Sequence, residues 1–176
     1  AAVSFEACGS IPVSGTTALQ GLRDAGEVKP GQAVLVNGAA GGVGTIAVQI
    51  AKAMGAVVTG VCSARNVALV RSLGADHVVD YGQEDFTTGE RRYDLVLDLV
   101  GNHPLSATRR VLTAHGRVVA GAGGAEHRWV GPMVDVLVGL ASNLFSAQRF
   151  VPLVDKPNAA DLAAVAAYVE AGAVTP

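Results

Sequence analysis

A glycine-rich loop between a short apolar run and a helical pattern constrains this chain more than any other feature. Residues 33–37 (AVLVN) follow the turn signal at residues 29–31 (KPG), and their β-branched, apolar character predicts a buried strand. From Gly42 to Met54 apolar side chains recur at helical spacing, and Gly55 follows as a stop signal. Residues 38–44 (GAAGGVG) therefore join a strand to a helix. This order is the start of a βαβ unit.

The same alternation continues along the chain. Further strands are predicted at residues 57–61, 77–80, 95–99 and 118–120, and helices at residues 66–73 and 105–112. Residues 4–25 are expected to be largely helical with a break near Pro12, and later helices to open at Gly131-Pro132 and to span residues 160–171 behind an Asn158 cap. The apolar stripe of that last helix is expected to be Leu162, Val165, Ala166 and Val169. Strands separated by helices pair in parallel. The predicted fold class is α/β, a Rossmann-type doubly wound parallel sheet, with residues 1–176 forming one domain.

Composition excludes several classes of protein. Half of the 176 residues are hydrophobic and only 16% are charged, which is not the composition of a disordered chain. The net charge of -2 argues against a nucleic-acid partner. Polar residues and glycines interrupt the apolar stretch at residues 33–51, so no membrane span is expected. Cys8 and Cys62 form no CxxC pair, so we expect neither a disulfide framework nor a thiolate zinc site, and a cytoplasmic location.

The glycine loop fits a dinucleotide-binding pattern as Ala39-x-Gly41-x-x-Gly44, with alanine in place of the usual first glycine. Gly41 would let the backbone approach a pyrophosphate, and Gly44 would let the helix lie close to the strand. The free N–H groups of Gly42 and Val43 would donate to phosphate oxygens at the positive end of the helix. The alternative is a glycine-rich turn with a purely structural role.

The end of the second predicted strand indicates which dinucleotide is bound. An NAD site usually places Asp or Glu there, about 20 residues beyond the glycines, to bind the ribose 2′-hydroxyl. Here the sequence has Ser63 and Arg65 instead. Both can bind a 2′-phosphate, which favours NADP(H). Alternatively, Arg65 only solvates the start of a surface helix.

Three further segments follow predicted strands. Tyr81 follows the third strand and is expected on the adenosine side, unless it is merely half-buried at the strand exit. Val100 and Asn102 follow the fourth strand, and Gly121 and Ala122 follow the fifth. Ligands of open α/β sheets bind outside these carboxyl ends, so these four residues are candidates for the nicotinamide side.

Other chemistries find no support in the sequence. Asp94 and Asp98 flank a strand and are better explained as capping groups than as an acid/base pair. The four histidines are scattered singly, without metal-ligand spacing, and no metal site is expected. Ser106 and Ser142 lack a nucleophile elbow, so no hydrolase chemistry is indicated and no catalytic residue is assigned.

Six short segments form a recognisable set: residues 16–21 (TTALQG), 34–44 (VLVNGAAGGVG), 48–52 (VQIAK), 73–76 (LGAD), 79–81 (VDY) and 93–98 (YDLVLD). Together they resemble the cofactor domain of zinc-independent medium-chain dehydrogenase/reductases, specifically the quinone oxidoreductase branch. By this resemblance Ala40, Gly41, Gly42 and Val43 hold the pyrophosphate, Ser63 and Arg65 the 2′-phosphate, Tyr81 the adenosine, and Val100, Asn102, Gly121 and Ala122 the nicotinamide.

The resemblance also implies an activity. Relatives transfer hydride from NADPH to a quinone or an α,β-unsaturated carbonyl, a small-molecule electron acceptor. They also have a GroES-like catalytic domain and C-terminal strands that this sequence lacks, so we expect a domain cut from a longer two-domain enzyme, inactive alone. A homodimer formed through the sheet edge is expected. The alternatives are an enoyl reductase domain of a polyketide synthase and a non-catalytic NADPH-binding or sensing module.

Overall fold

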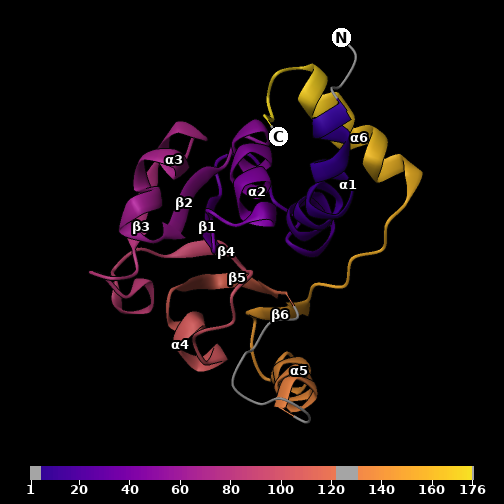
Figure 1. Ribbon diagram of the computed structural model, residues 1–176. Helices are drawn as coiled ribbons and strands as arrows, with labels where there is room; N and C mark the ends of the chain where they lie inside the picture. Colours follow the sequence, from indigo (N-terminus) through magenta and orange to yellow (C-terminus); the bar gives the residue numbers. More distant parts are fainter. Residues whose placement is uncertain (1–4, 122–130, 176) are drawn as a thin grey trace.

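The computed structural model describes residues 5–121 and 131–175 and contains a six-stranded, fully parallel sheet (Figure 1). The strands lie in the order β3-β2-β1-β4-β5-β6. Their bounds are β1 (Ala33–Asn37), β2 (Val57–Cys62), β3 (His77–Asp80), β4 (Tyr93–Asp98), β5 (Leu112–Ala120) and β6 (Arg149–Pro152). Both the α/β class and the doubly wound parallel sheet expected from the sequence are confirmed.

Helices cover both faces of the sheet. They are α1 (Phe5–Gln20), continued by a π-helical turn at Gly21–Ala25, α2 (Gly42–Ala53), α3 (Val67–Ser72), α4 (Leu105–Arg110), α5 (Gly131–Ser142) and α6 (Ala159–Glu170). Short 3-10 turns lie at Ala64–Asn66 and Phe86–Thr88. One hydrophobic cluster unites the sheet with α1, α2, α3 and α6, and a second joins its other face to α4 and α5 (Figure 1).

Strand order places a crevice beside β1. The chain runs outward from β1 to β2 and β3, then returns to the other side of β1 to form β4. Loops after β1 and β4 therefore diverge at this switch point, and open α/β sheets bind ligands there, outside the carboxyl ends of the strands. The strands that flank the crevice are rigidly placed, because Val34, Leu35, Val36 and Leu97 are fully buried.

Two helix predictions are wrong in detail. Helix α1 runs through Pro12 without the expected break. Proline removes one N–H bond, but the turn beyond it is held by the Thr16 hydroxyl, which donates to the Pro12 carbonyl at 2.6 Å, and by the burial of Ala18 and Leu19. In α6 the buried face includes Asp161, whereas Leu162, expected in the apolar stripe, is exposed.

Strand β6 was not predicted, and its free edge is blocked. It pairs with β5 from Arg117↔Arg149 to Ala120↔Pro152. The Phe150 N–H donates to Asn143 Oδ1 at 2.8 Å, and the Phe150 carbonyl accepts from Asn143 Nδ2 at 2.9 Å. Pro152 has no N–H to offer. The side chain of Asn143 thus takes the place of a further strand, which is one way that proteins protect a sheet edge.

Candidate functional site

A cleft of about 560 Å³ opens where β1, β2 and β4 end. Nine of the eleven residues proposed from the sequence line it: Ala40, Gly41, Gly42, Val43, Ser63, Arg65, Tyr81, Val100 and Asn102. Gly121 lies after β5, where its N–H donates to the Asp98 carbonyl at 2.9 Å, but it does not line the cleft. Ala122 lies outside the described residues.

The glycine loop forms one wall of the cleft. Gly38 adopts a φ of +89°, which turns the chain out of β1, and Gly41 caps α2 in an extended conformation. A Cβ on Gly44 would lie 2.1 Å from the Gly38 carbonyl oxygen, so only glycine lets α2 start this close to β1. A Cβ on Gly41 would meet only that oxygen, at 3.3 Å. The protein itself therefore tolerates a side chain at Gly41 far better than at Gly44.

The first turn of α2 faces the cleft with unpaired donors. The first N–H groups of any α-helix lack partners within the helix, and here they belong to Gly42, Val43 and Gly44. No acidic residue and no side-chain cap occupies this turn. The positive end of the helix dipole thus lies at a wall made of backbone, which is suited to phosphate oxygens.

The loop after β2 supplies the polar end of the cleft. Asn66 Nδ2 donates to Ser63 Oγ at 3.2 Å, which leaves the Ser63 O–H free to donate elsewhere. Arg65 is exposed and forms no ion pair with any described residue. Tyr81 is 63% exposed on the same rim, so it is not the half-buried tyrosine considered as its alternative.

Asn37 is a cleft residue that the sequence analysis missed. It ends β1, is 3% exposed, and donates from Nδ2 to Asp98 Oδ1 and to Asn102 Oδ1, at 2.8 Å each. Asp98 Oδ1 also accepts from the N–H groups of Val100 and Gly101, at 3.1 and 2.9 Å. The expected capping role of Asp98 is confirmed. The available signal for Asn37 was an amide at the end of an otherwise apolar strand.

Asp94 also caps, as expected: its carboxylate accepts from the Ala33 N–H at 2.9 Å and the Thr113 hydroxyl at 3.0 Å. Cys62 lines the cleft but is 3% exposed. Burial, and then the nearby Asp80 carboxylate, raises the pKa of its thiol. A neutral, covered thiol is a poor nucleophile, so Cys62 acts as a wall of the cleft.

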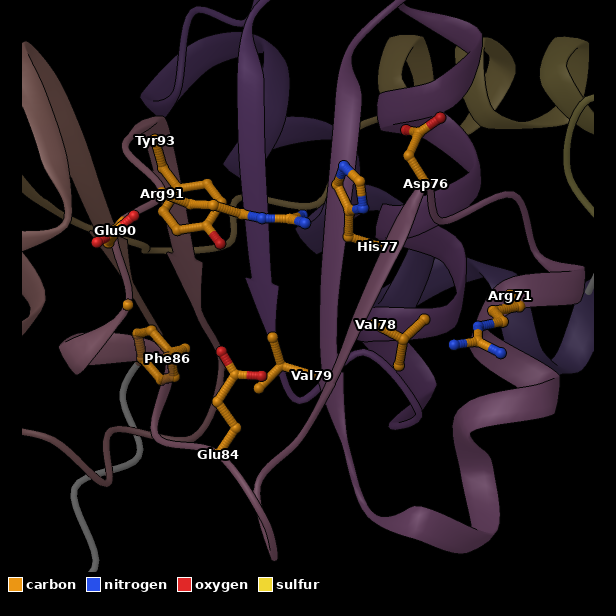
Figure 2. Close-up of a pocket in the computed structure, with 11 residues that line it drawn as sticks. Arg71, Asp76, His77, Val78, Val79, Glu84, Phe86, Glu90, Arg91 and Tyr93 are labelled. Atoms are coloured by element: carbon orange, nitrogen blue, oxygen red, sulfur yellow. The ribbon is translucent and has the colours of Figure 1, made fainter.

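A second hollow, of about 470 Å³, lies beside the edge strand β3 (Figure 2). Val79, Phe86 and Tyr93 contribute apolar surface to it, and charges of both signs line it, including Glu84 and Arg91. None of the residues proposed from the sequence takes part. Since it is remote from the carboxyl ends of β1 and β4, the first cleft is the better candidate for a ligand of this fold.

The described part of the chain contains neither a cluster of metal ligands nor a helix that could cross a membrane. No three His, Cys, Asp or Glu side chains among these residues gather as metal ligands would. Within the same residues, no helix has both the length and the apolar character needed to cross a membrane.

Comparison with known proteins gives the family. The model of the family described as zinc-binding dehydrogenase matches residues 73–176. The chloroplast envelope quinone oxidoreductase homolog of Arabidopsis thaliana is 34% identical over 174 residues, which cover 94% of this chain. The chain belongs to the quinone oxidoreductase branch of the medium-chain dehydrogenase/reductases. In this domain the glycine loop stands at the start of α2.

Two further proteins extend the comparison. The quinone oxidoreductase structure from Coxiella burnetii superposes with a TM-score of 0.81 at 31% identity, over 98% of this chain and 51% of that one. The trans-enoyl reductase pgmF of Aspergillus terreus is 46% identical over 90 residues, 49% of this chain and 25% of the relative. The chain spans about half the length of the Arabidopsis relative, 51%.

Proposed function

We propose that this chain is the NADPH-binding domain of a two-domain oxidoreductase that transfers hydride to a quinone or another α,β-unsaturated carbonyl. One observation carries the cofactor assignment. The 560 Å³ cleft has no Asp or Glu in its described lining, whereas Arg65, Ser63 and a helix N-terminus all offer positive charge or donors to it. That lining suits a ligand with phosphate at both places, as NADP has, better than a free ribose 2′-hydroxyl.

The residues present fit the dinucleotide from end to end. The N–H groups of Gly42 and Val43 would hold the pyrophosphate, with Gly41 and Ala40 as the backbone against which it lies. Arg65 and the free Ser63 O–H would bind the 2′-phosphate at the opposite end from Asn102.

Tyr81 would cover the adenosine, and Val100 and Asn102 would meet the nicotinamide side. The same role for Gly121, which does not line the cleft, and for Ala122, which lies outside the described residues, stays a prediction from the sequence. When bound, the nicotinamide supplies the hydride. The protein's contribution is to hold the ring in place, since hydride transfer chiefly needs a fixed geometry.

The acceptor is inferred from relatives. The names of the Arabidopsis and Coxiella proteins support a quinone, and the name of the Aspergillus protein supports an enoyl substrate. An enoyl reductase is therefore the second candidate function, and both reactions reduce an electron-poor C=C–C=O group. The substrate would bind between this domain and the catalytic domain that such relatives possess.

Titration with NADPH and NADH, followed by fluorescence, tests the cofactor assignment. We expect the wild type to prefer NADPH, and Arg65→Ala to lose roughly 1–3 kcal/mol of NADPH binding with no change for NADH. Arg91→Ala is the matched control, because Arg91 is also exposed but lines the hollow beside β3. Equal wild-type affinity for the two cofactors would contradict the 2′-phosphate site.

We also propose that the chain forms a homodimer. Five large apolar side chains within nine residues are exposed on and after α5: Leu137, Val138, Leu140, Leu144 and Phe145, the last of them 90% exposed. Since Asn143 blocks the β6 edge, contact would come from these side chains rather than from strand pairing. Sedimentation of the wild type should show a dimer that Phe145→Ser weakens. A wild-type monomer at high micromolar concentration would count against it.

A cytoplasmic location is likewise a proposal. The buried free thiol of Cys62 suits a reducing compartment. The Arabidopsis relative is named for the chloroplast envelope, so a relative of this domain is associated with a different compartment. Cell fractionation tests the location: recovery with a membrane or organelle would refute it.

A further inference from the structure

Asn37 occupies the floor of the cleft at the switch point of the sheet. Its backbone pairs in register with Val61 of β2 on one side and Asp98 of β4 on the other. Its carbonyl accepts from the Leu99 N–H at 3.2 Å, so the loop after β4 is attached to it by main chain as well as side chain. At 3% exposure the amide needs protein partners, because an unpaired buried polar group is costly.

Hydrogen bonds fix which way this amide points. Asp98 Oδ1 accepts from the N–H groups of Val100 and Gly101, so it presents an acceptor to Asn37. Asn37 must therefore turn its nitrogen, not its oxygen, toward Asp98. The second proton of the same NH2 group goes to Asn102 Oδ1 at 2.8 Å.

The orientation is passed on to Asn102. A side-chain amide has one acceptor end and one donor end. Because Asn37 engages the oxygen of Asn102, the NH2 of Asn102 is the end left for the cleft that this exposed residue lines. Among residues 12–121 and 136–175, whose side chains the structure describes, that NH2 has no hydrogen-bond acceptor.

We propose that Asn37 is a positioning residue, which turns the Asn102 amide so that its NH2 donates to an oxygen of the nicotinamide half of the dinucleotide. The carboxamide carbonyl and the ribose hydroxyls are acceptors of the right kind. This inference rests on the proposed function and deepens it. The hydrogen bonds that link Asp98, Asn37 and Asn102 determine that the cleft is offered a donor, the NH2 of Asn102, at the end away from Ser63 and Arg65.

The test compares a whole dinucleotide with its adenosine half. Asn102→Asp retains an oxygen for Asn37 but replaces the presented NH2 with a second oxygen. Asn37→Asp removes the donor that holds Asn102. For each variant we expect NADPH to bind about three- to tenfold more weakly, the value of one or two lost hydrogen bonds, while 2′,5′-ADP binds within about twofold of wild type. Asn143→Asp, which alters an amide far along the chain that bonds only Phe150, is the matched control and should change neither affinity.

A double variant separates positioning from direct contact. If Asn37 acts through Asn102, then Asn37→Asp combined with Asn102→Ala should bind NADPH no more weakly than Asn102→Ala alone. Additive losses, equal losses for both ligands, or unchanged NADPH affinity in Asn102→Asp would each overturn the inference. The exposed position of Asn102 keeps that last variant informative even if Asn37→Asp does not fold. Failure of the wild type to bind either ligand would instead overturn the proposed function.

Discussion

Two glycines of the same loop should respond differently to replacement by alanine: Gly44→Ala should lower stability, and Gly41→Ala should weaken NADPH binding. On Gly44 a Cβ would lie 2.1 Å from the Gly38 oxygen and 2.8 Å from the Ala39 Cα, both of them backbone atoms that cannot rotate away. Overpacking typically costs about 1–3 kcal/mol, and a backbone clash this close places Gly44→Ala at the top of that range, about 3 kcal/mol. For a domain of this size the Tm should fall by about 6–12 °C.

On Gly41 the added Cβ meets the protein only at 3.3 Å. Its backbone has a φ of −82°, open to any residue, so we expect Gly41→Ala to cost about 1 kcal/mol or less and to fold normally. Its defect should appear in binding instead, because the methyl group stands where the pyrophosphate must approach, and NADPH affinity should fall at least about tenfold.

Thermal unfolding and NADPH titration of both variants check this pair of expectations. Gly42→Ala is the matched control for stability, since a Cβ there meets only the Ser14 hydroxyl at 3.4 Å. A wild-type Tm for Gly44→Ala would refute the packing role of Gly44. Wild-type NADPH affinity for Gly41→Ala would refute the role of Gly41 in letting the pyrophosphate approach the backbone.

Two further predictions concern titratable groups. Hydrogen bonds from Gln20, then Arg23 and Asn158, lower the pKa of Asp161, so the stability it adds is present above the ordinary aspartate pKa of about 3.9 and is lost as pH falls through the lower folded value. Unfolding midpoints measured from pH 5 to pH 2 should therefore fall more steeply for the wild type than for Asp161→Asn, and parallel curves would contradict this. Burial, and then the Asp80 carboxylate, raises the pKa of the Cys62 thiol, so iodoacetamide at pH 7 should alkylate Cys62 more slowly than it alkylates free glutathione. Bound NADPH should slow the alkylation of Cys62 further. Alkylation of Cys62 as fast as that of glutathione would be inconsistent with a covered thiol.

Local patterns were enough to predict most of the fold. The strand at residues 77–80 and the Asn158 cap, whose Oδ1 accepts from the Asp161 N–H at 2.9 Å, are found as expected, because strand and cap signals lie within a few adjacent residues. Strand β6 was missed since its four residues carry no alternation and end in Pro152. Its existence depends on pairing with β5 and on hydrogen bonds to the amide of Asn143, and a local pattern reveals neither contact.

The residues of the cleft likewise fall into those that a local pattern predicts and those that depend on contacts distant in the sequence. The glycine loop and the residues after β2 follow a known relation between motif and ligand, so their gathering in one cleft was foreseeable. Asn37 was not, because its partners Asp98 and Asn102 lie 61 and 65 positions away in the chain. The pattern of residues 160–171 did not predict that Asp161 is buried and Leu162 exposed. Asp161 is buried because Gln20 and Arg23, far away in the sequence, donate hydrogen bonds to its carboxylate.

The central claim is that the dinucleotide lies at the carboxyl ends of the strands, across β1 and β4, and not in the hollow beside β3. Backbone amide NMR shifts recorded during NADPH titration measure this directly. We expect the largest shifts at residues 41–43, Ser63, Arg65 and Asn102, which line the cleft. Largest shifts at His77, Glu84 and Arg91, which line the other hollow, would contradict it.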